Sequence, residues 1–481
     1  MSARAQAPAP GAAPLPRQTL RAWISKHVLY LPTQRWRGEP VPQHLADLER
    51  SQWERPEALR ARQTERALAL VSHAARHVPH YRDAWRAAGA DPAAFRSLDD
   101  LRRLPLLEKD VMRANVRRLV SETAAVPLDP RKTSGSTGIP VPILKSRDAY
   151  ARIRAIWYRY ARWYGIDIGD RQGRFLGHPV TWKGVLREDV QDFILNKFRL
   201  DPVYLTPERM ERYWRKILRR PVVYLYGYAS AMVAFARHLE SVGEDPRRAG
   251  IRTLICTGET LYPFQESHLR HAFGVPVVNE YGCTESGVLA FPCPEAGRMH
   301  LSADNVLLEF LVGDRPAKPG EAGEVVLTDL YSPEVPLIRY RLGDVAVPSD
   351  GAPCACGRGL PTIERVEGRT SQMIVLPGGR AVHSEVFAYI SDAMGEVDRR
   401  IEGFRVRKTG DAAFTVQLVA QEPLAPATLD TLRGIVARVL GPQVELEVEQ
   451  VRELPRDPSG KLRYFVDDTS AAAAARPGEA R

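Results

Sequence analysis

The sequence predicts an α/β protein with a large, multi-subdomain N-terminal body and a small, mobile α+β domain at the C-terminus. Three observations support this prediction. The chain has 481 residues, which is more than one hydrophobic core usually serves. Its middle alternates short apolar strands with helices, which is typical of an α/β layered body. After Gly368, hairpins, a helix and an alternating strand form a compact module of roughly a hundred residues, large enough to fold alone.

These shifts in pattern predict the domain boundaries. We expect an N-terminal domain over 17–368, with a β-rich part at about 300–366, and a C-terminal domain over 369–466. Residues 1–16 are rich in Ala and Pro without the apolar core of a signal peptide, so we expect a disordered tail there. A second disordered tail is expected over 467–481, which contains a run of alanines.

The N-terminal part reads mainly as helices. Residues 57–77 carry apolar side chains at helical spacing and stop before a predicted turn at 78–81. Capped helix starts are expected at 97–101 and 106–110, and a further helix at about 146–164.

The middle of the chain has the βαβ rhythm. Strands are expected at 222–226, 252–257 and 275–279, with helices at 230–242 and 263–273 between them. Two later strands, 306–312 and 323–328, lie among Gly- and Pro-rich turns.

The C-terminal module is expected to begin with a hairpin at 373–375 that turns at 377–379. The elements expected after it are a helix from Ser384, strands at 404–408 and 414–420, a helix at 427–440 and a strand at 444–448.

Composition narrows the class of protein. Hydrophobic residues make up 44% and charged residues 26%, which is ordinary for a soluble enzyme, and no apolar run approaches the roughly 18 residues of a membrane span. The net charge is +10, but the arginines are dispersed, so we expect small anionic substrates and no nucleic acid. Five cysteines do not make a disulfide framework in so long a chain, which favours the cytoplasm.

A glycine- and hydroxyl-rich segment, TSGSTGIP, spans residues 133–140. Glycines let the backbone approach a polyphosphate, and hydroxyl groups can donate to it. The candidate phosphate-binding residues are Thr133, Ser134, Gly135, Ser136, Thr137 and Gly138. The segment is not a Walker motif, and an ordinary surface loop is the alternative interpretation.

Two further segments follow predicted strands. YGCTES, residues 281–286, offers an aromatic ring that can cover a purine and a carboxylate that can hold Mg²⁺. Gly258 and Glu259 occupy the same location after the preceding strand. In both cases a strand-end turn with an exposed carboxylate is the alternative.

Two charged residues extend the pattern. Asp344 is expected just past a strand, where a carboxylate can accept both ribose hydroxyls, although a salt bridge to Arg339 or Arg341 competes with that interpretation. Lys461 lies in PSGKLR, so a Ser-Gly turn can present its ammonium group. An ordinary surface lysine is the alternative.

TSGSTGIP, YGCTES, YRLGD, VEGR and PSGKLR occur in the order found in the adenylate-forming acyl-CoA synthetase superfamily. The chain most resembles its phenylacetate-CoA ligase branch, including the capsule-biosynthesis-like members, from about residue 75 to 466. The resemblance implies an AMP-forming acid-thiol ligase with a large adenylate-forming body. Such an enzyme joins a carboxylic acid to ATP, with Mg²⁺, as an acyl-adenylate and then transfers the acyl group to coenzyme A.

The same resemblance assigns roles by position. It implies that residues 134–138 form the phosphate loop, that Lys461 is the catalytic lysine of adenylation, and that Glu285 holds Mg²⁺. The residues implied to bind the nucleotide's adenine and ribose are Gly258, Glu259, Tyr281, Gly282, Thr284, Asp344 and Arg369. The residues implied to border the acid are Tyr226, Tyr228, Ala229 and Met232. The sequence departs from the family at Ile139, often a lysine, and at the hinge position Ser371, usually Asp or Lys.

Cys293, His300, Cys354 and Cys356 supply three thiolates and one imidazole, a set that tetrahedral Zn²⁺ accepts in structural sites. Some relatives in the resembled branch are similar in this arrangement, which adds to the zinc hypothesis; reduced thiols beside an unrelated histidine are the alternative. Cys256 and Cys283 are expected to be small core residues.

The acid is expected to be aromatic or otherwise apolar. The stretch 226–235, YGYASAMVAF, contains no carboxylate to anchor an α-amino group, which disfavours amino acids. Transfer to an amine, a hydroxyl or the thiol of a separate carrier protein remains the first alternative, and a nucleotide-binding protein without turnover the second. A homodimer is one option for the oligomeric state.

Overall fold

The computed structural model describes most of the chain. The described residues are 15–16, 18–132, 141–176, 182–202, 205–369, 373–375, 381–383, 400–401, 403–410, 412–420, 422–440, 444–455, 462 and 465–469. Within this part of the chain, no helix has both the length and the hydropathy that a membrane span requires.

Helices dominate the first hundred residues. They are α1 (Leu20–Ile24), the π-helical η1 (Ser25–Tyr30), α2 (Leu31–Trp36), α3 (Val41–Ser51), α4 (Pro56–His77), α5 (Pro79–Ala87), the 3₁₀ turns η2 (Pro92–Ala94) and η3 (Asp99–Arg103), and α6 (Lys109–Ala114). The predicted helix at 57–77 is confirmed by α4, which has Pro in its first turn and Arg76 and His77 in its last.

A twelve-stranded mixed sheet forms the centre of the molecule, in the order β11-β10-β12-β13-β14-β9-β8-β7-β6-β5-β3-β4. The parallel strands at one end are β3 (Gln172–Phe175), β4 (Lys197–Arg199), β5 (Tyr224–Gly227), β6 (Thr253–Thr257) and β7 (Val277–Cys283). Connecting helices are α8 (Trp182–Ile194), α9 (Pro207–Arg219), α10 (Ala229–Ser241), the turn η4 (Pro246–Ala249) and α11 (Pro263–Phe273). The predicted βαβ rhythm is therefore confirmed.

The other end of the sheet is antiparallel. Its strands are β8 (Gly287–Pro292), β9 (Met299–Leu301), β10 (Val306–Val312), β11 (Arg315–Pro316), β12 (Gly323–Asp329), β13 (Tyr340–Pro348) and β14 (Thr362–Arg369). A separate hairpin pairs β1 (Leu128–Lys132) with β2 (Pro142–Ser146), and it leads into α7 (Arg147–Trp163). Ser146 caps α7 by accepting a hydrogen bond from Ala149 N at 3.3 Å.

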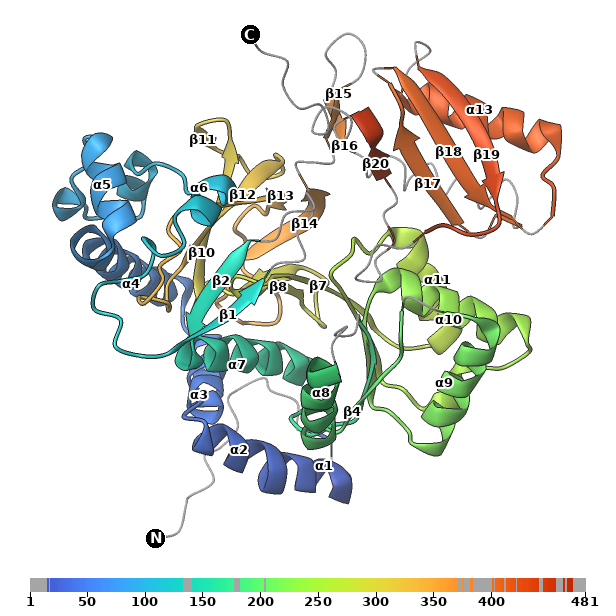
Figure 1. The fold of residues 1–481 in the computed structure, drawn as a ribbon, viewed down its shortest axis with the longest axis horizontal. Coiled ribbons are helices and arrows are strands. Elements are labelled where there is room, and N and C mark those ends of the chain that lie inside the picture. Colours follow the sequence, from blue (N-terminus) through green and yellow to red (C-terminus); the bar gives the residue numbers. More distant parts are fainter. Residues whose placement is uncertain are drawn as a thin grey trace.

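The C-terminal region forms its own four-stranded sheet, in the order β19-β18-β17-β20. Its elements are β17 (Gly403–Lys408), β18 (Ala413–Val419), α13 (Pro426–Leu440), β19 (Glu445–Val451) and β20 (Phe465–Asp467), and the hairpin of β15 (Met373–Val375) with β16 (Ala381–His383) precedes them. In Figure 1 this sheet stands above α10 and α11. Phe264 of α11 packs against its core, which links the two parts.

Three local predictions were wrong in detail. The predicted turn at 78–81 is the start of α5, because Pro79 fits the first helical position after extended Val78. The strand predicted at 275–279 continues to Cys283, because Tyr281, Gly282 and Cys283 pair antiparallel with β8. A Cβ at Gly282 would lie 2.9 Å from the Gly287 carbonyl oxygen, so glycine permits this tight hairpin. Asp344 lies inside β13 and not after a strand.

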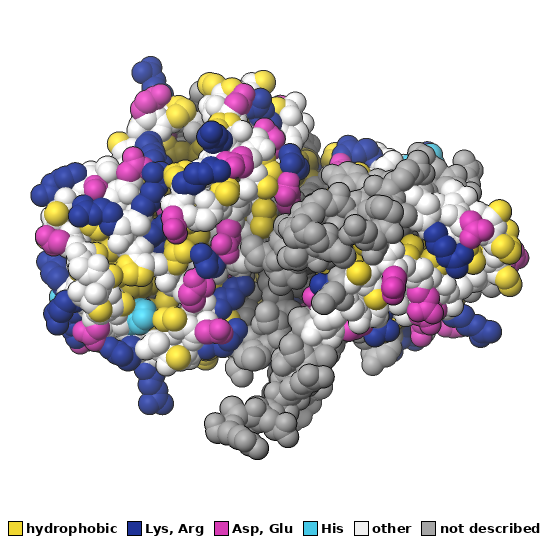
Figure 2. Space-filling view, turned by 90° about the horizontal axis from the view of Figure 1, so that it is seen from above, with side chains coloured by type: hydrophobic (Ala, Val, Ile, Leu, Met, Phe, Trp, Pro, Cys, Tyr) yellow, Lys and Arg dark blue, Asp and Glu magenta, His cyan; other side chains and the backbone are white. Residues whose placement is uncertain are grey.

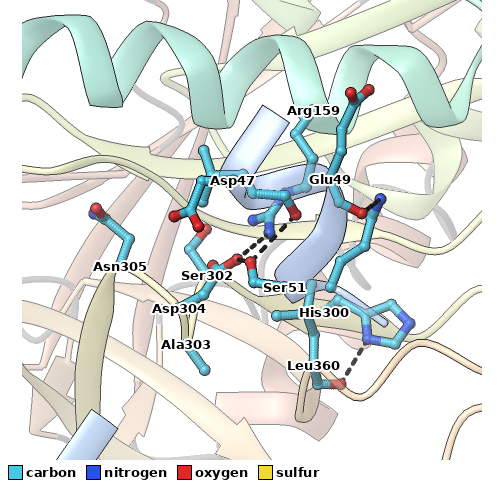
Figure 3. A network of polar contacts seen from close by, with 12 residues as sticks. Asp47, Glu49, Ser51, Arg159, His300, Ser302, Ala303, Asp304, Asn305 and Leu360 are labelled. Atoms are coloured by element: carbon cyan, nitrogen blue, oxygen red, sulfur yellow. Dashed lines mark hydrogen bonds and ion pairs between the residues drawn. The ribbon is translucent and has the colours of Figure 1, made fainter. Parts of the chain in front are cut away.

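Lys and Arg are interspersed with Asp and Glu on the face shown in Figure 2, without a basic stripe. Beneath the surface, a buried ion pair ties α7 to the segment after β9. Arg159 Nη1 lies 2.7 Å from Asp304 Oδ2, and both side chains are fully buried. Ser51 Oγ of α3 donates to the same carboxylate oxygen at 2.6 Å (Figure 3).

We expect Arg159→Met to lower the free energy of unfolding by about 3–5 kcal/mol, because it leaves the Asp304 carboxylate buried without its counter-ion. Urea titration of the purified protein measures this loss. The matched control is Arg215→Ala, which removes an exposed pair with Glu211 and should change stability by less than about 0.5 kcal/mol. Equal effects of the two substitutions would contradict the assignment.

Candidate functional site

Two of the predicted motifs lie outside the described residues. They are the phosphate-loop residues Thr133, Ser134, Gly135, Ser136, Thr137 and Gly138, with Ile139, and the lysine Lys461. Ser371 also lies outside them. The site is therefore built from the residues that surround these segments.

Tyr281 and Asp344 meet at the centre of the site. The hydroxyl of Tyr281 on β7 donates to Asp344 Oδ2 on β13 at 3.0 Å, and both residues are buried. Asp344 is also the Cα partner of Arg369 at the end of β14. Arg339 pairs with Glu309, and Arg341 pairs with Glu108 and Glu324, so these arginines have other acidic partners than Asp344.

Glu285 follows two residues after β7 and is buried. Its Oε1 accepts a hydrogen bond from the hydroxyl of Tyr340 on β13 at 3.1 Å. Gly282 and Thr284, between Tyr281 and Glu285, are exposed. The hairpin between β7 and β8 thus presents an aromatic ring, backbone groups and a carboxylate at one edge of the sheet.

A buried lysine, Lys145, connects the β1–β2 hairpin to this edge of the sheet. It was not among the residues predicted from the sequence. Lys145 Nζ lies 2.5 Å from Asp329 Oδ2 and 2.7 Å from Ser332 Oγ. Ser286 Oγ, next to Glu285, donates to the same oxygen of Asp329 at 2.9 Å. Burial alone would raise the pKa of Asp329, but the Lys145 ammonium and the hydrogen bonds from Tyr331 N and Ser286 Oγ together hold that pKa below its ordinary value. Strand β2 of the hairpin is therefore fixed to the segment that carries Glu285.

Glu259 contacts the C-terminal region directly. Its Oε1 accepts a hydrogen bond from the backbone N–H of Leu462 at 2.8 Å. The same carboxylate accepts bonds from Ser230 N and Ser230 Oγ, both at 3.0 Å, at the start of α10. Gly258 has a φ of +74°, which turns the chain so that Glu259 points at both groups. Leu462 follows Lys461 in the chain, so this carboxylate lies beside the predicted lysine segment.

The four residues predicted to border the acid are not alike. Tyr228, Ala229 and Met232 are buried in the hydrophobic core around α10. Tyr226, at the end of β5, is only half-buried. Its hydroxyl group lies beside a polar side chain.

The polar side chain beside Tyr226 is that of Glu280, which was not among the residues predicted from the sequence. Its side chain, one residue before Tyr281, is buried on the opposite face of β7. Oε1 accepts hydrogen bonds from Tyr226 Oη at 3.0 Å and Thr257 Oγ1 at 2.8 Å, and Oε2 accepts one from Trp157 Nε1 at 2.8 Å. Burial raises the pKa of this carboxyl above its ordinary value. A charged residue inside an apolar strand was the signal that could have revealed it.

The cysteine and histidine side chains converge as predicted. The ligand atoms of Cys293, His300, Cys354 and Cys356 all lie within 4.8 Å of one another. Cys293 Sγ lies 3.8 Å from Cys354 Sγ, and Cys356 Sγ lies 3.2 Å from His300 Nε2. Cys293 follows β8, His300 is on β9, and the other two are on the loop between β13 and β14.

This cluster has the geometry of a metal site. Two sulfurs on a tetrahedral zinc, each at ~2.3 Å, are separated by ~3.8 Å. His300 Nδ1 donates to the Leu360 carbonyl oxygen at 2.8 Å (Figure 3). This leaves Nε2 available to a metal, 3.2 Å from Cys356 Sγ. The described side chains could therefore hold a tetrahedral ion. Cys256 and Cys283 lie elsewhere; burial raises the pKa of both thiols, which fits their predicted role as core residues.

Comparison with known proteins gives consistent relatives, although no family model matches the chain. It is 26% identical over 462 residues to a phenylacetate-coenzyme A ligase of Thermus thermophilus, covering 85% of this chain and 97% of that one. It is 21% identical over 377 residues to Protein CapK of Staphylococcus aureus, covering 77% and 80%. The fold is similar to that of 2-hydroxyisobutyryl-CoA ligase in the postadenylation state, with a TM-score of 0.70 and 20% identity over 87% of this chain and 90% of that one.

We expect Glu259→Ala to speed amide hydrogen exchange at Leu462 by at least about 10-fold, because the backbone N–H loses its acceptor. Hydrogen exchange followed by mass spectrometry measures this. Ser230→Ala is the matched control, since it removes a donor to the same carboxylate and leaves the Leu462 contact intact. Unchanged exchange at Leu462 in Glu259→Ala would show that the contact does not persist in solution.

Proposed function

The chain belongs to the adenylate-forming acyl-CoA synthetase superfamily, in its phenylacetate-CoA ligase-like branch, and on that premise we propose that it activates a carboxylic acid with ATP and transfers the acyl group to coenzyme A. The first step forms an acyl-adenylate and releases pyrophosphate. The second step forms a thioester and releases AMP.

One contact carries the assignment. The hydrogen bond from Leu462 N to Glu259 joins Leu462, the residue after Lys461 in the chain, to the carboxyl edge of the parallel strands. Ligands of open α/β sheets bind at that edge. Tyr281 lies at the same edge, on the neighbouring strand β7, and it is hydrogen-bonded to Asp344 on β13. This convergence supports a nucleotide bound between the large domain and the C-terminal domain.

The chemistry requires cations at the reacting phosphate, because a carboxylate and a polyphosphate repel each other. Lys461 supplies an ammonium group that stabilises the charge developing in the transition state. The TSGSTGIP loop holds the phosphates with backbone N–H and hydroxyl groups. Asp344 and Arg369 bind the ribose, and Tyr281 covers the adenine, with Gly258, Glu259, Gly282 and Thr284 beside it.

Glu285 is the proposed ligand of Mg²⁺. Tyr340 orients this buried carboxylate through Oε1, and carboxylate oxygen is the ligand type that Mg²⁺ prefers. The ion would neutralise the phosphate oxygens during attack.

The two steps need two positions of the C-terminal domain, residues 369–466, against the body, residues 17–368. We place the hinge at 369–371. At position 371 this chain has a serine, where the resembled family usually has Asp or Lys. Glu259 would release Leu462 when the domain turns for thioester formation. The cytoplasm is the proposed location, a homodimer is a proposed assembly, and a separate carrier protein is the alternative thiol partner.

Incubation of the protein with MgATP and a library of carboxylic acids tests the function. We expect AMP release that depends on one class of acid and rises with coenzyme A. Lys461→Ala should lose pyrophosphate exchange by at least about 100-fold, because it removes the ammonium group from the transition state, and should still convert supplied acyl-adenylate to thioester. Exchange without any rise on adding coenzyme A would favour an amine, hydroxyl or carrier-thiol acceptor. No exchange with any acid would favour a nucleotide-binding protein without turnover.

We further propose that Cys293, His300, Cys354 and Cys356 hold a structural zinc ion. The sulfur spacing and the orientation of His300 support it. Four protein ligands leave no open position for a water or a substrate, so its role is to join the β8–β9 segment to the β13–β14 loop.

Purified protein should contain about one zinc per chain by elemental analysis, and Cys354→Ala should lose it because three ligands bind less tightly than four. Cys256→Ala is the matched control, since it removes a buried cysteine far from the cluster in sequence. Zinc well below stoichiometry in the wild-type protein, or equal zinc in the two variants, would end the proposal.

A further inference from the structure

The Glu280 carboxylate is a buried acidic group at one edge of the central sheet. It lies at the carboxyl ends of three adjacent parallel strands, with Tyr226 on β5, Thr257 on β6 and Glu280 itself on β7. Ligands approach parallel sheets at this edge. Tyr226 and Thr257 are only half-buried, so the cluster borders the surface of the site and is not sealed inside the core.

The partners of Glu280 within the described part of the chain are all neutral. Three hydrogen bonds from these residues reach it, from a phenol, an alcohol and an indole N–H. Among the described residues, no lysine, arginine or histidine forms an ion pair with it. A buried carboxylate without a cation is costly, and a chain retains such a group when something else uses it.

The hydrogen bonds of Glu280 show which of its carboxylate oxygens can accept a further one. A carboxylate has about four lone-pair positions, two on each oxygen. Oε1 already accepts from Tyr226 and Thr257, while Oε2 accepts only from Trp157 among the described residues. The remaining position is on Oε2, beside the ring of Trp157, which also packs edge-on against Tyr226 with ring centroids 5.6 Å apart.

We propose that the acid substrate carries a hydroxyl or amino group that donates a hydrogen bond to Glu280, so that Glu280 sets substrate specificity. The inference rests on the proposed function, because it names the class of acid that the proposed reaction uses. Tyr226 is one of the residues implied to border the acid, and its hydroxyl lies 3.0 Å from Glu280 Oε1. The aromatic surfaces of Trp157 and Tyr226 suit the ring of an aryl acid, and Glu280 suits a polar substituent on it.

The stretch 226–235 contains no carboxylate to anchor an α-amino group, and on that ground amino acids were disfavoured. Strand β7 supplies one from a position 54 residues beyond Tyr226 in the chain.

Matched acids test the proposal in the wild-type protein. The probes are phenylacetic and benzoic acids, each unsubstituted and with a hydroxyl, amino or methoxy group at every ring position. The readout is kcat/KM for AMP release with coenzyme A present. We expect kcat/KM for at least one hydroxyl- or amino-substituted aryl acid to exceed that of both its unsubstituted and its methoxy counterpart by at least about 10-fold. A site built to hydrogen-bond a donor on the substrate rejects analogues that lack this donor. The methoxy acids separate hydrogen-bond donation from size.

Variants then assign the preference to one residue. Glu280→Gln should reduce the ratio of donor acid to unsubstituted acid by at least about 10-fold, while Thr257→Val, which removes one of the neutral partners, should leave that ratio within about 3-fold. Should Glu280→Gln not fold, Glu280→Asp, which withdraws the carboxylate, replaces it. A wild-type preference for unsubstituted or methoxy acids would overturn the inference and leave the proposed function standing. No AMP release with any acid would overturn both.

Discussion

Strand β7 pairs in parallel with β6 on one side and antiparallel with β8 on the other, and the whole arrangement of the site depends on this change of direction. Because successive side chains of a strand point to opposite faces, Glu280 and Tyr281 serve different neighbours. Tyr281 reaches Asp344 on β13, whereas Glu280 reaches Trp157, Tyr226 and Thr257. A register shift of one residue would exchange the two side chains and destroy both sets of contacts.

Buried ion pairs join the elements around strand β7 to one another. Lys145, Asp329 and Ser286 connect the β1–β2 hairpin to the segment of Glu285. Arg159 and Asp304 connect α7 to the antiparallel strands. Such pairs add little net stability compared with apolar packing, but they tolerate few alternative geometries. They therefore fix the positions of the elements that they join.

Local signals made much of the fold predictable. Helix α11, predicted from residue 263 to 273 within the βαβ rhythm, has those bounds, and Pro263 fits its first position and Gly274 its left-handed end. The continuation of β7 through Tyr281, Gly282 and Cys283 was missed because Tyr-Gly-Cys resembles a turn until β8 is available to pair with it. The Cys and His set was predictable since such residues are few. Glu280 and Lys145 were not, because their partners lie 23 to 187 residues away and only the folded sheet brings them together.

The hydrogen-bonded link between the two halves of the large sheet is short. Strands β9 and β14 share only two residue pairs, His300 with Thr362 and Met299 with Ile363. His300 is one of those residues, and the loop that carries Cys354 and Cys356 ends where β14 begins. The four sulfur and nitrogen donors thus lie beside a junction of only two residue pairs. A coordinated ion there would tie the loop before β14 to β9, and so keep strands β10–β14 in register with the rest of the sheet.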